Sequence, residues 1–292
     1  MLAEETVAED KSRLLYNGYF SQFNLIKESF VSASERMLHR EDIATRLSLL
    51  DLFYTTNFNR FAEFGLEDLT ETIWRLCFDG AYGHSDIELI KKVQRFVNDC
   101  TEKPEKAQGN ELYKSLFCAK FGIIRPGDDA MGYAAQSLIS KYLFFLLECN
   151  HCENTKGFPI YDSIAKELQS PLYKKLVGGR VNGGDMVGYI ARMNAILDCL
   201  KNSHDKFSTV WHMPSIVCNT QFGLLDYFLW RIGKCGRFSF SLLWSRKEKM
   251  EHYFAAERLR RNECSNALSD FYSLPRRFRD WYAIYQSVIA KE

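Results

Sequence analysis

The chain has 292 residues, of which 46% are hydrophobic and 26% are charged. That much apolar surface excludes an intrinsically disordered polymer, and the mixed composition excludes collagen-like, coiled-coil and low-complexity classes. The length predicts one large or two modest globular domains.

Membrane and secretory classes are also disfavoured. The longest strongly apolar stretch, 142–147, is far shorter than the roughly 20 residues of a membrane-spanning helix. Residues 1–10 carry four carboxylates and no basic side chain, the opposite of a signal peptide. Nine cysteines, an odd number, lie mostly within helical apolar patterns, which is typical of buried thiols in a reducing cytosol.

The small net charge of +1 hides an asymmetry along the chain. Residues 1–150 hold 17 basic and 23 acidic side chains, whereas residues 151–292 hold 21 and 14. Such a chain can present one cationic face to a polyanion such as a nucleic acid. Ordinary surface variation accounts for the same numbers, so charge alone leaves both interpretations open.

Apolar residues recur at spacings of three and four almost throughout, and long alternating patterns are missing, which predicts an all-α fold. Ser85 with Glu88 has the form of a capping box, and Asp185 precedes another helical pattern. The polar run 101–110, with Pro104 and Gly109, predicts a linker. In chain order, the predicted helices are 11–30, 41–53, 66–78, 86–98, 111–121, 130–148, 162–177, 186–201, 222–234, 240–261 and 277–290.

Two side chains in the stretch 137–166 are candidates for a catalytic role. Lys141 lies among apolar and aromatic residues, where burial disfavours the ammonium and leaves a nucleophilic amine. Asp162 follows Pro159 at a predicted helix start, where the helix dipole stabilises a carboxylate. If the two helices pack as neighbours, Lys141 and Asp162 meet between them. Taken singly, a snorkelling surface lysine and a plain helix cap explain the same residues.

Together, the two residues resemble a catalytic signature. A helix carrying a lysine, then an extended segment ending in an aspartate at a helix start, resembles the helix-hairpin-helix DNA glycosylases, especially their 8-oxoguanine glycosylase branch. Segments 140–144, 158–163 and 225–234 are more closely similar to divergent bacterial proteins with an 8-oxoguanine-glycosylase fold. Some relatives of that kind act against phages by excising modified viral bases. The resemblance covers about 122–234.

The resemblance implies a two-lobed helical fold. Residues 1–105 would form an N-terminal helical lobe and residues 106–240 a glycosylase-like catalytic core. Residues 241–292 would supply C-terminal helices that pack back on the N-terminal lobe. The expected protein is a monomer in the cytoplasm, in the bacterial cytosol or nucleoid, with no membrane contact.

The resemblance also implies roles for individual residues. Asp162 would stabilise the oxocarbenium-like sugar as the base departs. Lys141 would attack C1′ of the sugar, with a Schiff base in members that also cleave the strand, or would orient the substrate. Phe145, Tyr161 and Asp226 would line the pocket for a flipped base. DNA contacts would come from Arg125, Gly127, Ser163, Arg180, Arg231, Lys234 and Arg237.

The chain departs from the family at the hairpin. A Leu-Pro-Gly-Val-Gly-like loop before the lysine is absent, with Ser137 and Ile139 where glycines would stand. The four clustered cysteines that hold an iron–sulfur cluster in another branch are absent too.

Residues 149–152 have zinc-like Cys-x-x-Cys spacing, but no second such pair exists. The glycine-rich run 178–185 lacks the Gly-Lys-Ser/Thr sequence that ends a P-loop, which disfavours nucleotide hydrolysis. We expect no metal or redox cofactor.

The sequence therefore predicts a hydrolase: a DNA-binding glycosylase of base excision that flips out a modified or damaged base and leaves an abasic site. Antiviral defence is one setting for this activity, and associated strand cleavage stays open. Two alternatives remain: a catalytically silent DNA-binding module of the same fold, and a helical protein-interaction subunit that uses the acidic N-terminal lobe.

Overall fold

The structure, a computed structural model, describes residues 19–31, 37–54, 56, 58, 62–80, 83–123, 132–150, 156–178, 184–201, 220–223 and 225–226. These segments are mostly helical, which confirms the predicted all-α class. The longer helices are α2 (Tyr19–Val31), α3 (Arg40–Phe53), α5 (Gly65–Leu76), α6 (Asp86–Glu102), α8 (Gln136–Cys149), α9 (Ser163–Leu176) and α10 (Met186–Lys201). The shorter elements are α7 (Pro104–Gly109), the π-helix η1 (Tyr113–Cys118) and an antiparallel hairpin of β1 (Phe78–Asp79) and β2 (Gly83–His84).

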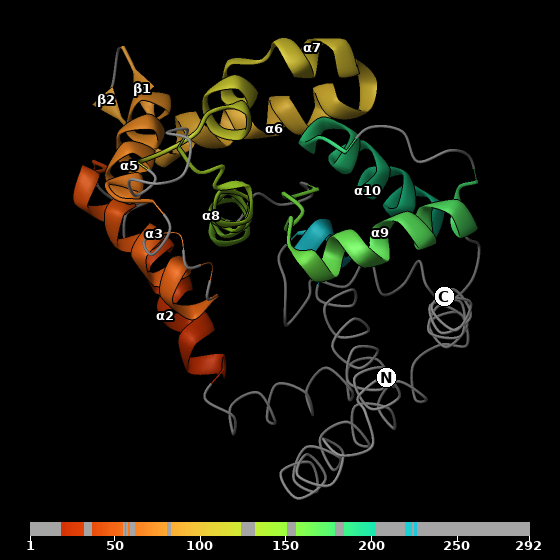
Figure 1. Cartoon of the computed structure of the whole chain (residues 1–292), viewed down its shortest axis with the longest axis horizontal. Coiled ribbons are helices and arrows are strands. Elements are labelled where there is room, and N and C mark those ends of the chain that lie inside the picture. Colours follow the sequence, from red (N-terminus) through yellow and green to blue (C-terminus); the bar gives the residue numbers. More distant parts are fainter. Residues whose placement is uncertain are drawn as a thin grey trace, which may run out of the picture.

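The helix α8 is the centre of this arrangement. Every residue from Leu138 to Cys149 is buried, and α2, α3, α6 and η1 all pack against it. Figure 1 shows α8 end-on, with α2, α3 and α5 to one side and α9 and α10 to the other. A helix that is apolar on all sides is stable only when it is surrounded. The apolar run 142–147 thus lies at the centre of the hydrophobic core.

Two predicted helix starts are confirmed by their caps. Asp185 accepts the Gly188 N–H at 2.9 Å, immediately before α10. The Ser85 hydroxyl accepts the Glu88 N–H at 3.4 Å, at the start of α6. The observed bounds of α10, Met186–Lys201, are the predicted ones.

The predicted linker 101–110 is wrong. The helix α6 continues to Glu102, and α7 occupies Pro104–Gly109. Proline suits the first turn of a helix because its missing N–H has no intrahelical partner there, and glycine suits a helix end. Ala107 is fully buried, and α7 packs against both α6 and α10. Most of the segment is exposed and Ala107 is its buried side chain, so it is a helical surface element that packs on α6 and α10.

Two predicted helices have different ends. The helix predicted from residue 130 begins only at Gln136, because the backbone of Tyr133 pairs with that of Phe121 through two 3.0 Å hydrogen bonds. The helix predicted to reach Phe78 ends at Leu76, and Phe78 instead pairs with His84 in the hairpin. Predicted helices 240–261 and 277–290 lie outside the described residues.

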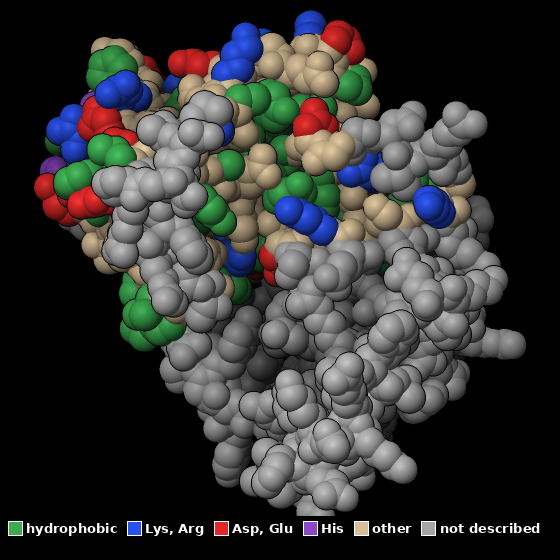
Figure 2. All heavy atoms as spheres, in the orientation of Figure 1, with side chains coloured by type: hydrophobic (Ala, Val, Ile, Leu, Met, Phe, Trp, Pro, Cys, Tyr) green, Lys and Arg blue, Asp and Glu red, His purple; other side chains and the backbone are tan. Residues whose placement is uncertain are grey.

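The hairpin end of the molecule carries a mixed polar and aromatic surface. Trp74 stacks on His84 with ring centroids 3.5 Å apart, and the Arg40 guanidinium lies 5.3 Å from the Trp74 ring. Arg40 also pairs with Glu71 at 2.9 Å. Figure 2 shows acidic, basic and apolar side chains intermixed at this end. Such exposed ion pairs contribute little to stability.

None of the described helices has both the length and the apolar character that a bilayer crossing requires.

Candidate active site

Lys141 is a charged residue inside the most buried helix of the protein. Its side chain lies on α8, and the residue is only 4% exposed. The ammonium donates to the Ser137 hydroxyl at 2.6 Å and lies 5.3 Å from the ring centroid of Tyr54. Burial lowers the pKa of Lys141, and the negative charges of Asp162 and Asp226 oppose this shift. The environment therefore favours the neutral amine more than water does.

Asp162 occupies the N-cap of α9, as predicted. Its carboxylate accepts the Ala165 N–H at 2.8 Å, one of the free donors at the helix start. The side chain is half-buried. Of the two predicted catalytic residues, Asp162 is therefore the one that reaches solvent.

A hydrogen bond between neighbouring residues joins the two elements. The Ser140 hydroxyl accepts the Tyr161 N–H at 2.9 Å and donates to the Ser137 carbonyl at 2.9 Å. This bond fixes the residue before Lys141 against the residue before Asp162. Within the described segments the two charged side chains form no ion pair, and they interact electrostatically over a longer distance.

Asp226 joins the same group from a distant part of the chain. Its helical turn starts at Thr220, whose N–H and hydroxyl both donate to Glu148 at 3.0 and 2.9 Å. The Phe222 N–H donates to the Lys156 carbonyl at 2.8 Å. Burial and the negative charge of Asp162 raise the pKa of Asp226 well above its ordinary value, and Lys141 opposes this shift.

Two tyrosines pack beside the carboxylates. The Tyr189 hydroxyl on α10 donates to the Ile160 carbonyl at 2.6 Å, and its ring meets Tyr161 edge-on at 4.8 Å. Lys166 covers Tyr161, with its ammonium 3.8 Å from the ring centroid. Burial, Asp226 and Asp162 raise the pKa of Tyr189, so it stays a neutral hydrogen-bond donor.

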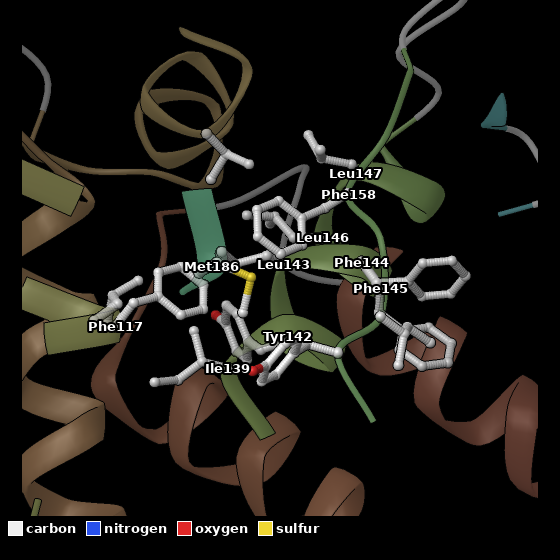
Figure 3. Close-up of a cluster of buried hydrophobic side chains, with 14 of the residues drawn as sticks. Phe117, Ile139, Tyr142, Leu143, Phe144, Phe145, Leu146, Leu147, Phe158 and Met186 are labelled. Atoms are coloured by element: carbon white, nitrogen blue, oxygen red, sulfur yellow. The ribbon is translucent and has the colours of Figure 1, made fainter. Parts of the chain in front are cut away.

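Phe145 does not lie where a pocket-lining residue was expected. It is fully buried and contacts the rings of Phe30, Tyr54 and Phe144. Figure 3 shows Phe144 and Phe145 on one side of α8, away from Phe117 and Met186. Phe145 is a core residue because other helices cover α8 on all sides. The sequence did not indicate this covering, because Lys141 suggested that one face of the helix is exposed.

The predicted DNA contacts fall largely outside the described residues. This applies to Arg125, Gly127, Arg180, Arg231, Lys234 and Arg237. Ser163 is the first residue of α9, and only its backbone is described. The described part of the site therefore consists of Lys141, Asp162, Tyr161, Asp226 and their neighbours.

The sequence interpretation gave no role to three residues that hold this group together. Ser137 precedes Lys141 by one helical turn on the same face, a spacing that could have indicated their contact. Tyr54, at the end of α3, and Tyr189, inside α10, carried no such signal. Both meet the site only because distant helices pack beside α8 and α9.

The described residues offer no metal centre. No group of three or more His, Cys, Asp or Glu side chains in these segments is placed to bind a metal ion. Cys149 is buried, and burial raises the pKa of its thiol to about 12, which disfavours the thiolate that binds zinc. The other members of the zinc-like spacing, His151 and Cys152, lie outside the described residues.

The raised pKa of Asp226 predicts a pH-dependent cost in stability. Between the unfolded carboxyl pKa of about 3.9 and the raised folded pKa, the folded state binds more protons, so stability falls as pH rises. The Asp226→Asn variant removes this dependence. We expect it to be more stable than the parent at pH 8 and equally stable at pH 4. Urea unfolding at both pH values measures the difference, with exposed Glu111→Gln as the control.

Comparison with known proteins identified no relative of this chain. No family model matches the chain, and neither a curated protein nor a solved structure shows a significant match.

Proposed function

We propose that the protein is a DNA N-glycosylase that everts a modified or damaged nucleotide and breaks its glycosidic bond. The observation that supports this most directly is the grouping of Lys141 with Asp162 across α8 and the start of α9, fixed by the bond between Ser140 and Tyr161. An amine and a carboxylate held together are the groups that stabilise and trap an oxocarbenium-like sugar. The resemblance of the surrounding segments to 8-oxoguanine-glycosylase folds supports the same proposal, including its two-lobed architecture.

The carboxylate of Asp162 is the group that meets the sugar in this proposal. It is half-buried, and the first turn of α9 holds it through the Ala165 N–H. A carboxylate fixed beside C1′ lowers the energy of the positive charge that develops there as the base leaves. Because the helix positions the charge in advance, little reorganisation is needed during the reaction.

Lys141 acts next to this carboxylate. Its lowered pKa favours an amine that can attack C1′. Its 4% exposure favours the second role, in which the ammonium orients Asp162 and the substrate. A borohydride trap separates the two roles, since only covalent attack gives a reducible Schiff base between the protein and DNA.

The decisive variant is Asp162→Asn, because asparagine is also a good N-cap. We expect it to fold normally and to release base about 10²–10³-fold more slowly than the parent. DNA with oxidised, alkylated or phage-type modified bases is incubated with each protein, and alkali-labile abasic sites are measured. The matched control is Asp99→Asn on α6, which makes the same charge change and is expected to leave base release unchanged.

Other outcomes point to the alternatives. Salt-sensitive DNA binding without abasic product from any of these substrates would identify a silent DNA-binding module. Absence of DNA binding at low salt would contradict both DNA-based functions and favour a protein-interaction subunit. An antiviral role predicts base release from DNA of phages that carry modified cytosines in preference to unmodified DNA.

A further inference from the structure

A serine one helical turn before Lys141 links this buried lysine to the surface of the protein. The Lys141 ammonium donates to the Ser137 hydroxyl at 2.6 Å, a short distance for a hydrogen bond from a charged donor. Lys141 is only 4% exposed, whereas Ser137 is partly exposed. Every residue of α8 from Leu138 to Cys149 is buried. The Ser137 hydroxyl therefore contacts the lysine nitrogen at the point where α8 leaves the surface.

The helix holds this contact in place. Residues four positions apart lie on the same face of an α-helix, so Ser137 and Lys141 stay neighbours while α8 is formed. The Ser140 hydroxyl donates to the Ser137 carbonyl and accepts the Tyr161 N–H, both at 2.9 Å. These bonds tie the same turn of α8 to the residue before Asp162. The hydroxyl and the amine are thus positioned before any substrate binds.

A buried ammonium becomes a nucleophile only after it loses a proton. The electron pair that would attack carbon is held in an N–H bond until then. Burial lowers the pKa of Lys141, which makes the loss easier than in water, but the proton still needs a path out of the protein. A hydroxyl group can accept a proton on its oxygen and release its own. Ser137 places such a group at contact distance from the nitrogen.

Other titratable groups face Lys141 from the elements around α8. Tyr54, at the end of α3, has its ring centroid 5.3 Å from the ammonium. Asp162, before α9, and Asp226, in the turn 220–226, interact with Lys141 electrostatically and favour its charged form. The remaining ionised side chains that α2, α3 and α6 bring to α8 gather at Tyr142 and Glu148 instead; they are Lys27, Arg46 and its partner Asp86.

We infer that Ser137 is the positioning residue and proton relay of Lys141, a role that rests on the covalent form of the proposed function. An ammonium proton moves to the Ser137 oxygen as the hydroxyl proton moves to a water molecule, so the serine is unchanged and the amine gains a free electron pair. As this pair bonds to C1′, the bond from C1′ to the base breaks and the base leaves with its electrons. The attached nitrogen then loses a further proton by the same route, and the departed base takes up one proton from water.

The two properties of the hydroxyl predict opposite effects of its removal. As an acceptor it stabilises the ammonium, so its loss lowers the pKa of Lys141 and increases the fraction of neutral amine. As a relay it speeds proton transfer, so its loss slows the reaction of the amine. A variant without the hydroxyl should therefore hold more neutral amine and still react more slowly. A purely structural hydrogen bond would give the first effect without the second.

The reaction of Lys141 with formaldehyde tests this without DNA. Formaldehyde forms a Schiff base with a neutral amine, a mild hydride donor reduces it, and mass spectrometry measures methylation of each lysine from pH 6 to 10. We expect Ser137→Ala and Ser137→Val to react about 10²-fold more slowly than the parent at the high-pH plateau, with the midpoint at lower pH. Ser137→Thr should react like the parent. Threonine and valine have similar shapes and differ by the hydroxyl, and exposed Lys114 is the internal control.

Two results of this experiment would overturn the relay. One is a Lys141 that stays unmethylated in the parent at every pH while Lys114 reacts. The other is a plateau rate in Ser137→Ala and Ser137→Val equal to that of the parent. Alanine is the strongest helix former and the position is partly exposed, so Ser137→Ala is expected to fold. Should it not fold, the threonine and valine variants decide.

Borohydride trapping on DNA with modified bases separates this inference from the function on which it rests. We expect Ser137→Ala to trap more slowly than the parent and Ser137→Thr to restore the rate. If the parent releases base and traps DNA, and Ser137→Ala does both at the parent rate, the relay is overturned and the glycosylase proposal stands. If the formaldehyde reaction shows the expected pattern and no DNA loses a base, the relay of Lys141 stands and the glycosylase proposal fails.

Discussion

Replacing Arg46 with methionine is expected to lower the free energy of unfolding by about 3–5 kcal/mol. Arg46 is fully buried, and both of its terminal nitrogens donate to Asp86 at 2.8 Å. It also donates to the carbonyls of Ser29 and Phe30 and to the Tyr142 hydroxyl. Methionine fills similar space but leaves the Asp86 carboxylate buried without its partner. Urea unfolding followed by circular dichroism measures the loss.

Two further variants test whether the unpaired charge is responsible. Adding Asp86→Asn to Arg46→Met removes the charge left behind, so the double variant should be more stable than Arg46→Met alone. The exposed pair of Arg40 and Glu71 is the matched control, and Arg40→Gln is expected to cost less than about 1 kcal/mol. Equal losses for Arg46→Met and Arg40→Gln would contradict the proposed importance of burial.

The second large effect is expected for Gly157→Ala, at about 2–4 kcal/mol. Gly157 has a φ of +79°, where side chains other than glycine are strained. A β-carbon there would also clash with the Thr220 hydroxyl. Relief of that clash displaces Thr220 from Glu148, and with it the turn that carries Asp226. We therefore expect lower stability and slower base release together.

Gly178→Ala is the matched control for this variant. Gly178 has nearly the same φ, +77°, and a β-carbon there would meet no atom of the described residues within 4 Å. Its cost measures backbone strain alone, about 1 kcal/mol. The difference between the two variants, read from thermal unfolding and single-turnover rates, isolates the contact with Thr220. Identical behaviour of the two would show that the Thr220 contact contributes nothing.

Local signals predicted the bounds of α10 and the placement of Asp162 at the start of α9. The cap at Asp185 and the apolar periodicity of α10 depend on residues close in sequence, and the structure agrees with both. The segment 101–110 was misjudged because its composition is polar. The contacts of α7 with α6 and α10, which bury Ala107, depend on packing that no local pattern encodes.

The site was predictable only in part for the same reason. The pairing of Lys141 with Asp162 was expected from the family resemblance of one stretch of the chain, on condition that their two helices pack as neighbours. Tyr54 lies beside Lys141, Tyr189 bonds the Ile160 carbonyl, and Asp226 interacts electrostatically with the pair. These interactions depend on three separate helices or turns. Phe145 was assigned to a pocket from its spacing to Lys141, whereas the covering of α8 on every side places it in the core.

The bond between Glu148 and Thr220 has a consequence for the order of folding. These residues are 72 positions apart, and the Arg46 bond to Tyr142 spans 96. Closing such long loops costs chain entropy before any contact repays it, so contacts of this kind tend to form after local helices. The turn that carries Asp226 is therefore expected to dock after the local helices have formed, so a newly synthesised chain places this carboxyl beside the site only at a late stage of folding.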